Sequence, residues 1–176
     1  ADAGTLYRMD DHNALAFEIV RNDTLGIAMG GTSGKAPSFP PVQLYDPAGK
    51  PVLSMVVAYA VHNDCSVNIA DAYEDDRFDF SGTKTFDKTT GYRSQSFLTV
   101  PMKNHDNEII GVLQLLNAKD RETGRVTRFI ESDQVITESL ASQAAIALTT
   151  QQLINHLEEL FEAFVKIINF AIDDNS

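Results

Sequence analysis

The sequence has a single cysteine, Cys65, and no tryptophan. One cysteine excludes an internal disulfide and a zinc site built from several cysteines, and such usage is typical of a reducing compartment. No apolar run approaches the roughly 20 residues that a membrane-spanning helix needs, and the N-terminus has no signal-peptide layout. We therefore predict a cytoplasmic protein with no direct membrane contact.

Basic residues are also scarce, since 14 Lys and Arg stand against 25 Asp and Glu, for a formal net charge of −11. The basic side chains are scattered, and those between Lys119 and Arg128 are interleaved with acids. A field of this sign repels nucleic acid and anionic lipid. Nucleic acid is therefore excluded as a predicted partner.

The four histidines do not suggest a metal centre. No two of them stand at the spacing of a ligand pair, and His105-Asp106 lies among turn-forming residues with no histidine helix beside it. No nucleophile motif with a paired base is found either. We predict a chain with no metal site, no catalytic residues and no obligatory cofactor.

Two further motifs fail as functional signatures. Gly30–Lys35 looks like a phosphate-binding loop, but Met29 stands where its first glycine belongs and Ala36 replaces the Ser or Thr after the lysine. We interpret the glycines as a flexible connection. Cys65 opens a strand pattern and is interpreted as a small buried apolar residue, with a nucleophile or a bilin attachment point as the open alternatives.

Hydrophobic periodicity predicts strands along most of the chain. We expect one hairpin around the turn Asp10–Asn13 and a central one around Asn104–Asn107, because apolar residues alternate with a period of two on both sides of each turn. A helix is expected after Pro51, with the proline in its first turn and its end at Asn63 and Asp64. A short strand over Val67–Ile69 and a partly helical lid from Asp71 to Thr90 follow.

The region from Asp133 to Ile172 contains neither proline nor glycine, which predicts one long helix or two helices end to end. Positions 146, 150, 153, 157, 160, 164, 167 and 171 alternate in steps of three and four and carry mostly apolar residues, as in a heptad seam. We expect Val135, Ile136 and Leu140 to pack on the domain itself. The seam beyond Ala147 is expected to pair with a second subunit, giving a homodimer.

Five motifs then occur in a characteristic order: Ala3–Tyr7, Asn68–Tyr73, Thr89–Ser94, Val100–Met102 and Ile110–Asn117. Together they resemble the successive signatures of a GAF domain over residues 1 to 149, and most of all the GAF domains of cyclic-nucleotide phosphodiesterases and their bacterial relatives. The resemblance implies an α+β fold with a central antiparallel sheet flanked by helices and a long C-terminal signalling helix. It also implies a further helix, upstream of Ala1 or missing.

The same family carries an Asn-Lys…Phe…Asp-Glu signature, which Asn117, Lys119, Phe129 and Asp133 resemble, with Ala118 inserted and Gln134 in place of the glutamate. The resemblance implies a salt bridge between Lys119 and Asp133 near the pocket.

The resemblance also implies a ligand site between sheet and lid for a cyclic nucleotide or another small molecule. The matching positions are Ile69, Ala70, Asp87, Thr90, Ser94 and Gln114. Amide and hydroxyl groups suit a base edge, and N–H groups at a helix start suit a phosphate. In the alternative interpretation, Thr90 and Ser94 only cap a turn and Gln114 faces a pocket filled by side chains or by an unrelated metabolite.

The last residues, Leu160 to Ser176, resemble the first helix of an HD-GYP domain, the cyclic di-GMP phosphodiesterase module. The resemblance implies that residues 1–149 form a GAF sensory domain and residues 150–176 a coiled-coil signalling helix that runs into an HD-GYP output domain. The full-length parent would then be a bacterial, metal-dependent phosphodiesterase, a hydrolase.

We hypothesise that a ligand orders the Asp71–Thr90 lid and that the change at the sheet alters the packing of the helix after Asp133. A ligand-free structural dimerisation module is the open alternative. A GAF-fold methionine sulfoxide reductase is set aside, because that enzyme needs several cysteines and this chain has only Cys65.

Overall fold

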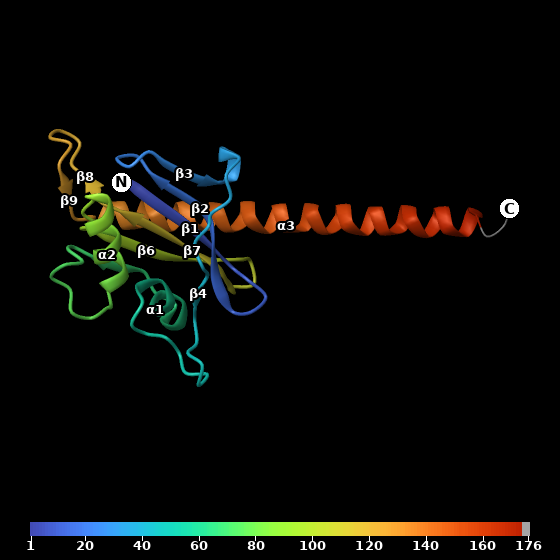
Figure 1. The fold of residues 1–176 in the computed structure, drawn as a ribbon, viewed down its shortest axis with the longest axis horizontal. Coiled ribbons are helices and arrows are strands. Elements are labelled where there is room, and N and C mark those ends of the chain that lie inside the picture. Colours follow the sequence, from blue (N-terminus) through green and yellow to red (C-terminus); the bar gives the residue numbers. More distant parts are fainter. Residues whose placement is uncertain (174–176) are drawn as a thin grey trace.

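The computed structural model describes residues 1–173, with side chains as far as Phe170. Its centre is an antiparallel sheet with the strand order β3-β2-β1-β7-β6-β5, and β4 pairs with β2 (Figure 1). The strands are β1 (Ala3–Met9), β2 (Ala14–Asn22), β3 (Ile27–Gly30), β4 (Val42–Gln43), β5 (Val67–Ile69), β6 (Phe97–Lys103) and β7 (Ile109–Leu116). A separate ribbon joins β8 (Ala118–Lys119) to β9 (Val126–Thr127). The helices are α1 (Val56–Asn63), α2 (Ser81–Thr90), α3 (Glu131–Asp173) and the 3₁₀ turn η1 (Gly31–Ser33). The predicted α+β architecture with a long C-terminal helix is confirmed.

The first hairpin forms around the predicted turn. The Asp10 carboxylate accepts hydrogen bonds from the N–H groups of His12 and Ala14 at 2.8 and 2.9 Å, and Asn13 adopts a left-handed φ of 56°. Asparagine and aspartate favour such turns because their short side chains bond to nearby backbone groups.

The second hairpin, β6–β7, is central as predicted, because β7 lies between β1 and β6. At Gly111 the backbones of β1 and β7 approach so closely that a Cβ atom would lie 2.2 Å from the Tyr7 carbonyl oxygen. Only glycine fits this position without moving a strand.

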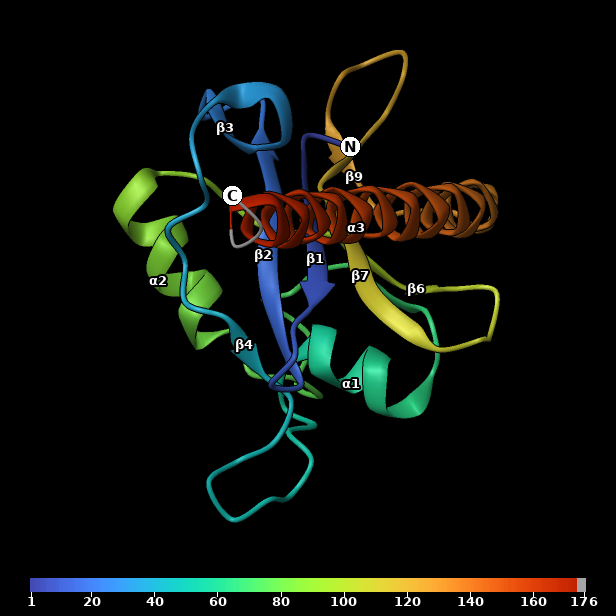
Figure 2. The ribbon, with the colours of Figure 1, turned by 90° about the vertical axis from the view of Figure 1, so that its right-hand side faces the viewer.

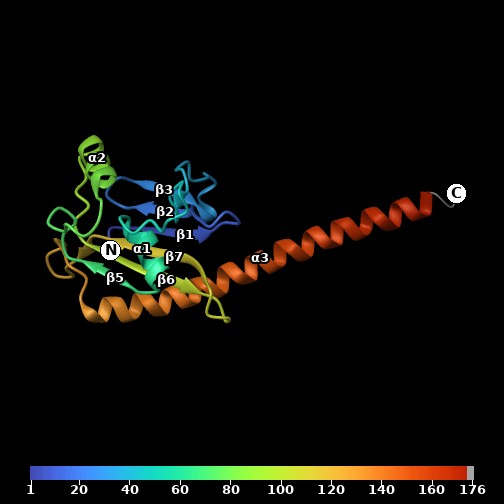
Figure 3. The ribbon, with the colours of Figure 1, turned by 90° about the horizontal axis from the view of Figure 1, so that it is seen from below.

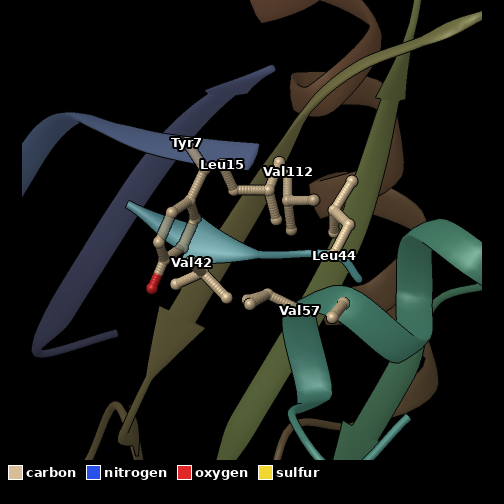
Figure 4. Close-up of a cluster of buried hydrophobic side chains, with 7 residues drawn as sticks. Tyr7, Leu15, Val42, Leu44, Val57 and Val112 are labelled. Carbon is tan, nitrogen blue, oxygen red and sulfur yellow. The ribbon is translucent and has the colours of Figure 1, made fainter. Parts of the chain in front are cut away.

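Side chains of the central strands alternate between the two faces of the sheet, and each face has its own core. On one face, β1 and β7 pack against α1 in a cluster that contains Tyr7, Leu15, Val42, Leu44, Val57 and Val112 (Figure 4). On the other face, Leu98 and Val100 pack against Ala141 and Ala145 of α3. The sheet therefore separates the α1 layer from α3.

Helix α1 begins later than predicted, at Val56, and Pro51 is not in its first turn. Pro51 instead bridges Tyr45, and the Val52 N–H donates to the Leu44 carbonyl at 2.8 Å. This pairing keeps Pro51 and Val52 out of the helix, and the chain bends at Ser54 and Met55 before the helix begins. The helix ends as predicted at Asn63, with Asp64 in the left-handed region at φ 49°.

Helix α3 is continuous, and its rotation on the sheet differs from the prediction. Thr137, Ala141 and Ala145 face the sheet and are at most 3% exposed. The prediction that Val135, Ile136 and Leu140 pack on the domain is wrong, because their side chains are 60, 55 and 47% exposed. Alanines let the helix approach the sheet closely, so the small side chains set its rotation and the large ones remain outside.

Beyond the sheet, α3 continues as an isolated helix (Figures 1 and 3), and this part points toward the viewer in Figure 2. The seam residues are exposed, for example Ile146 at 68% and Leu157 at 56%, while the side chain of Ala171 lies outside the described residues. Within residues 1–173, no helix has the length and apolar character needed to cross a membrane.

Candidate functional site

A cavity of about 650 Å³ opens on the α1 face of the sheet. Its floor consists of β1, β2 and β7, and its walls come from the first turns of α2 and from the segment between β3 and β4. Small-molecule sites typically have volumes of about 300–1,000 Å³. The cavity is therefore large enough for a nucleotide-sized ligand.

Aromatic side chains dominate the walls. The ring of Phe17 lies 4.7 Å from that of Tyr7 and 5.1 Å from that of Phe39, measured between centroids, so three rings lead from the floor to the outer wall. Phe86 of α2 and Phe97 of β6 also line the cavity. Such walls suit a ligand with a flat apolar ring, because aromatic pairs gain from offset or tilted stacking.

A row of polar groups crosses the floor. Thr5 on β1 pairs with Gln114 on β7, and Gln114 pairs in turn with Thr99 on β6. The Gln114 side-chain amide donates to the Thr99 hydroxyl at 2.9 Å. Burial raises the pKa of the neighbouring Tyr7 hydroxyl, and the bond to Thr5 lowers that pKa by a smaller amount. The hydroxyl therefore stays protonated, and the floor offers neutral donors and acceptors.

Two of the six predicted ligand positions, Ser94 and Gln114, line the cavity. Asp87 is 3% exposed and lies behind Ser94. Its carboxylate accepts hydrogen bonds from the Ser94 N–H and hydroxyl at 2.7 and 2.8 Å and from the Tyr73 hydroxyl at 2.9 Å. Asp87 therefore ties α2 to the segment that precedes β6 and does not line the cavity.

The other three predicted positions lie elsewhere. Ile69 is 1% exposed and belongs to the hydrophobic core under α1. Ala70 lines a separate shallow hollow beside Phe129. Thr90 is exposed, and its hydroxyl donates to the Phe86 carbonyl at 2.9 Å within α2, so the structure does not bring these three residues to the cavity.

The signature residue Asn117 is at the centre of a buried polar network. Its side-chain oxygen accepts from the Gln95 N–H at 2.7 Å, and its nitrogen donates to the Tyr92 hydroxyl at 2.9 Å and the Arg93 carbonyl at 2.8 Å. Tyr92 also lines the cavity, which places this network directly behind one wall.

The salt bridge implied between Lys119 and Asp133 is not formed in the described residues. Lys119 pairs with Asp2, while the Asp133 carboxylate accepts the Ile130 N–H at 3.0 Å at the start of α3. Asp2 is within reach because its N–H pairs with the Leu116 and Asn117 carbonyls beside β7. Phe129 is 6% exposed and packs against α3 in the core.

Asp2 closes the same polar network. Burial alone would raise the pKa of its carboxyl group, but bonds from Lys119, Tyr92 and Thr24 outweigh burial and lower that pKa. The Tyr92 hydroxyl donates to Asp2 at 2.8 Å. Burial, together with this carboxylate, raises the pKa of Tyr92, so the hydroxyl stays protonated at neutral pH.

Sequence reasoning missed Thr5, Tyr7, Phe17, Phe39 and Phe86 as cavity residues. Period-two alternation in the first strand places Thr5 and Tyr7 on the same face of the sheet. This pattern could have identified both as cavity residues. Phe39 lies in an irregular segment and gives no periodic signal.

Comparison with known proteins gives a consistent family. The family model described as "GAF domain" matches residues 1–148. The dual 3',5'-cyclic-AMP and -GMP phosphodiesterase 11A of Takifugu rubripes is 31% identical over 124 residues, which cover 69% of this chain and 13% of that protein. A cGMP-specific 3',5'-cyclic phosphodiesterase of Drosophila pseudoobscura pseudoobscura is 25% identical over 97% of this chain and 14% of its own length. The chain therefore spans only a small part of these relatives.

Solved structures agree on the fold. The GAF domain of a phosphoenolpyruvate-protein phosphotransferase from Coxiella burnetii superposes with a TM-score of 0.60 at 16% identity, over 88% of this chain and 76% of that one. The free methionine-R-sulfoxide reductase of Neisseria meningitidis gives 0.54 at 14% identity, over 87% and 70%. At such identities the likeness shows the shared fold alone.

Proposed function

This chain belongs to the GAF domain family, a family of regulatory small-molecule-sensing domains, and on that premise we propose that the cavity on the α1 face is its sensory site. The observation that carries the proposal is a cavity of about 650 Å³ with a polar floor on the strands whose opposite face holds α3. A ligand there would contact the elements that position the long helix.

We propose a cyclic mononucleotide as the ligand. Thr5 and Gln114 offer hydroxyl and amide groups to a base edge, and the aromatic walls suit its flat ring. Gly82 and Thr83 in the first turn of α2 also line the cavity, and first-turn N–H groups have no partner within their helix, so they suit a cyclic phosphate. The similarity to two cyclic-nucleotide phosphodiesterases supports this choice.

Alternation along β1 and β7 supports a route from ligand to helix. Gln114 lines the cavity, while its neighbours Leu113 and Leu115 pack on the side of α3. In β1, Leu6 lies on the α3 side between Thr5 and Tyr7. A shift of these strands on binding would move their cavity face and their α3 face together. Coupling requires such an element, one that the ligand contacts differently in two states.

The protruding part of α3 supports a dimeric coupling helix. Leu153, Leu157 and Leu160 are each at least 56% exposed, and their heptad spacing suits pairing with the same helix of a second copy. Between Leu160 and Phe170 apolar residues occur on all sides of the helix, a pattern of helices that are buried all round. This change supports a coiled coil that runs into an output domain, which we propose is an HD-GYP cyclic di-GMP phosphodiesterase.

A ligand-free dimerisation module is the second candidate, because the exposed seam does not depend on the cavity. A thermal-shift titration with cyclic AMP and cyclic GMP separates the two. A ligand at 100 times its dissociation constant stabilises a protein by about 2.7 kcal/mol. We expect that stabilisation in the native chain, a loss of most of it in Gln114→Met, and none of this loss in Leu115→Met, the matched change on the opposite face. Absence of any shift, with no co-purifying molecule in native mass spectrometry, favours the dimerisation module.

A further inference from the structure

Two segments border the cavity on its outer side, and they differ in how firmly they are held. The first is Asp71–Thr90, which contains α2. The Ala72 N–H donates to the Gln95 carbonyl at 2.8 Å and the Asp79 N–H to the Ser54 carbonyl at 2.7 Å. Near the far end, the Asp87 carboxylate accepts bonds from Ser94, outside the segment, and from Tyr73, inside it. This segment is therefore bonded to the rest of the domain near its start, before α2 and near its end.

The second segment, residues 31–41, we call the strap. Inside it, the Ser33 hydroxyl accepts from the Lys35 N–H and donates to the Lys35 carbonyl. The Lys35 carbonyl also accepts the Gly30 N–H at 2.7 Å. Within the described chain, residues 36–41 make no hydrogen bond, and most of the strap is exposed to solvent. Because few buried contacts and unbonded backbone mark regions of low local stability, the strap is the weakest part of the cavity wall.

Both ends of the strap are fixed, which limits how it can move. At Gly30 (φ 73°) a Cβ atom would lie 1.8 Å from the Glu18 carbonyl oxygen, so this end lies tightly against β2. At the other end, Val42 pairs with Leu15 of β2. Gly31 and Gly34, with φ of 56° and 71°, supply the backbone freedom between these points.

A single aromatic contact holds the middle of the strap. Phe39 is 37% exposed, lines the cavity, and lies with its ring centroid 5.1 Å from that of Phe17. Across the cavity mouth, Phe86 of α2 is 36% exposed and lines the same cavity. Phe39 therefore belongs to a weakly held wall and Phe86 to a firmly held one.

We propose that the strap is the entrance gate of the cavity and that Phe39 is its ligand-contacting residue. Phe39 leaves Phe17 when the strap opens, and it closes on a flat aromatic ring of the ligand when the strap returns. The gate is thus the strap and not the Asp71–Thr90 segment that the sequence indicates. The identity of the ring rests on the proposed function, whereas the mobility of the strap does not.

The absence of tryptophan from the sequence makes a direct test available. Phe39→Trp and Phe86→Trp each place one reporter at nearly equal exposure on the same cavity, so the second is a matched control. We expect lower fluorescence anisotropy for Phe39→Trp than for Phe86→Trp without ligand. On titration with cyclic AMP or cyclic GMP, the anisotropy of Phe39→Trp rises and that of Phe86→Trp stays nearly constant.

Thermal shift of the same samples and hydrogen exchange of the native chain separate the possible failures. A nucleotide that stabilises the protein while leaving the Phe39→Trp signal and strap exchange unchanged overturns the gate and leaves the proposed function standing. If neither nucleotide stabilises the protein, the proposed ligand fails and ligand-free exchange decides the gate. Strap amides are expected to exchange within about tenfold of unstructured rates and at least about 100-fold faster than those around Asp87. Equal protection of the two segments overturns the gate.

Discussion

Replacing Asn117 by alanine should cost far more stability than its turn conformation explains. Asn117 is 2% exposed and adopts a left-handed φ of 54°. The change leaves the Gln95 N–H and the Arg93 carbonyl without their side-chain partner, and each buried group left unsatisfied costs about 1–3 kcal/mol. The left-handed backbone adds about 1 kcal/mol for alanine. We expect a total loss of about 3–7 kcal/mol from these two principles.

Asn107 provides the matched control for this change. It has a similar φ of 64° but is exposed in the β6–β7 turn, where its side chain makes no hydrogen bond within the described residues. Asn107→Ala should therefore lose only the backbone part, about 1 kcal/mol. Asn117→Gly should avoid this backbone cost and lose only the stability that the side-chain hydrogen bonds of Asn117 provide.

Urea unfolding followed by circular dichroism at 222 nm gives the free energies for all three variants. For a chain of this length, 1 kcal/mol corresponds to about 2–4 °C in Tm, so Asn117→Ala should melt roughly 6–28 °C below the native protein. Equal losses in Asn117→Ala and Asn107→Ala would refute the reasoning, because the buried bonds would then contribute nothing measurable.

Three further outcomes are expected. The Asp2 carboxyl has a pKa below its ordinary 3.8, so the stabilisation it provides is complete above that pH and is lost as the pH falls through the folded-state pKa. In urea unfolding, the difference in free energy of unfolding between the native protein and Asp2→Asn should therefore be constant from pH 7 to about 4 and should shrink below. Gly111→Ala should destabilise the sheet by about 3 kcal/mol or more in the same assay, since the new Cβ meets a facing carbonyl. Leu153→Glu should weaken self-association at least about 100-fold by light scattering, whereas the neighbouring exposed change Gln152→Glu should leave it intact.

Most of the sheet could be predicted because its signals are local. The turns at Asp10–Asn13 and Asn104–Asn107 contain side chains that bond to their own backbone, and period-two alternation flanks both. The unbroken region after Asp133 predicts a long helix for the same local reason. The sequence predicts too early a start for α1, because a proline suits the first turn of a helix, whereas Pro51 pairs with Tyr45 in a small loop.

What the sequence did not predict depends on contacts between distant segments. The partner of Lys119 is Asp2, and only the pairing of the first residues beside β7 brings the two together. The rotation of α3 follows from alanines that fit closely on β6 and β7, while larger residues such as Ile136 lie outside. Phe39 reaches the cavity because both ends of the strap are tied to β2, which no periodic pattern records.

The positions of the strap and the floor suggest that binding and output can be separated. The strap touches the cavity from outside and is remote from α3, so a change such as Phe39→Ala should alter entry and release of a ligand without altering the helix. Residues of the floor adjoin both faces: Gln114 lines the cavity, and Leu115 beside it packs toward α3. A domain in which the strap transmitted the signal would lose helix response in Phe39→Ala even at saturating ligand. On this geometry the response at saturation should persist in Phe39→Ala and be lost when Leu115 is truncated to alanine, because among the described residues the strands of the sheet, and not the strap, contact both the cavity and the helix.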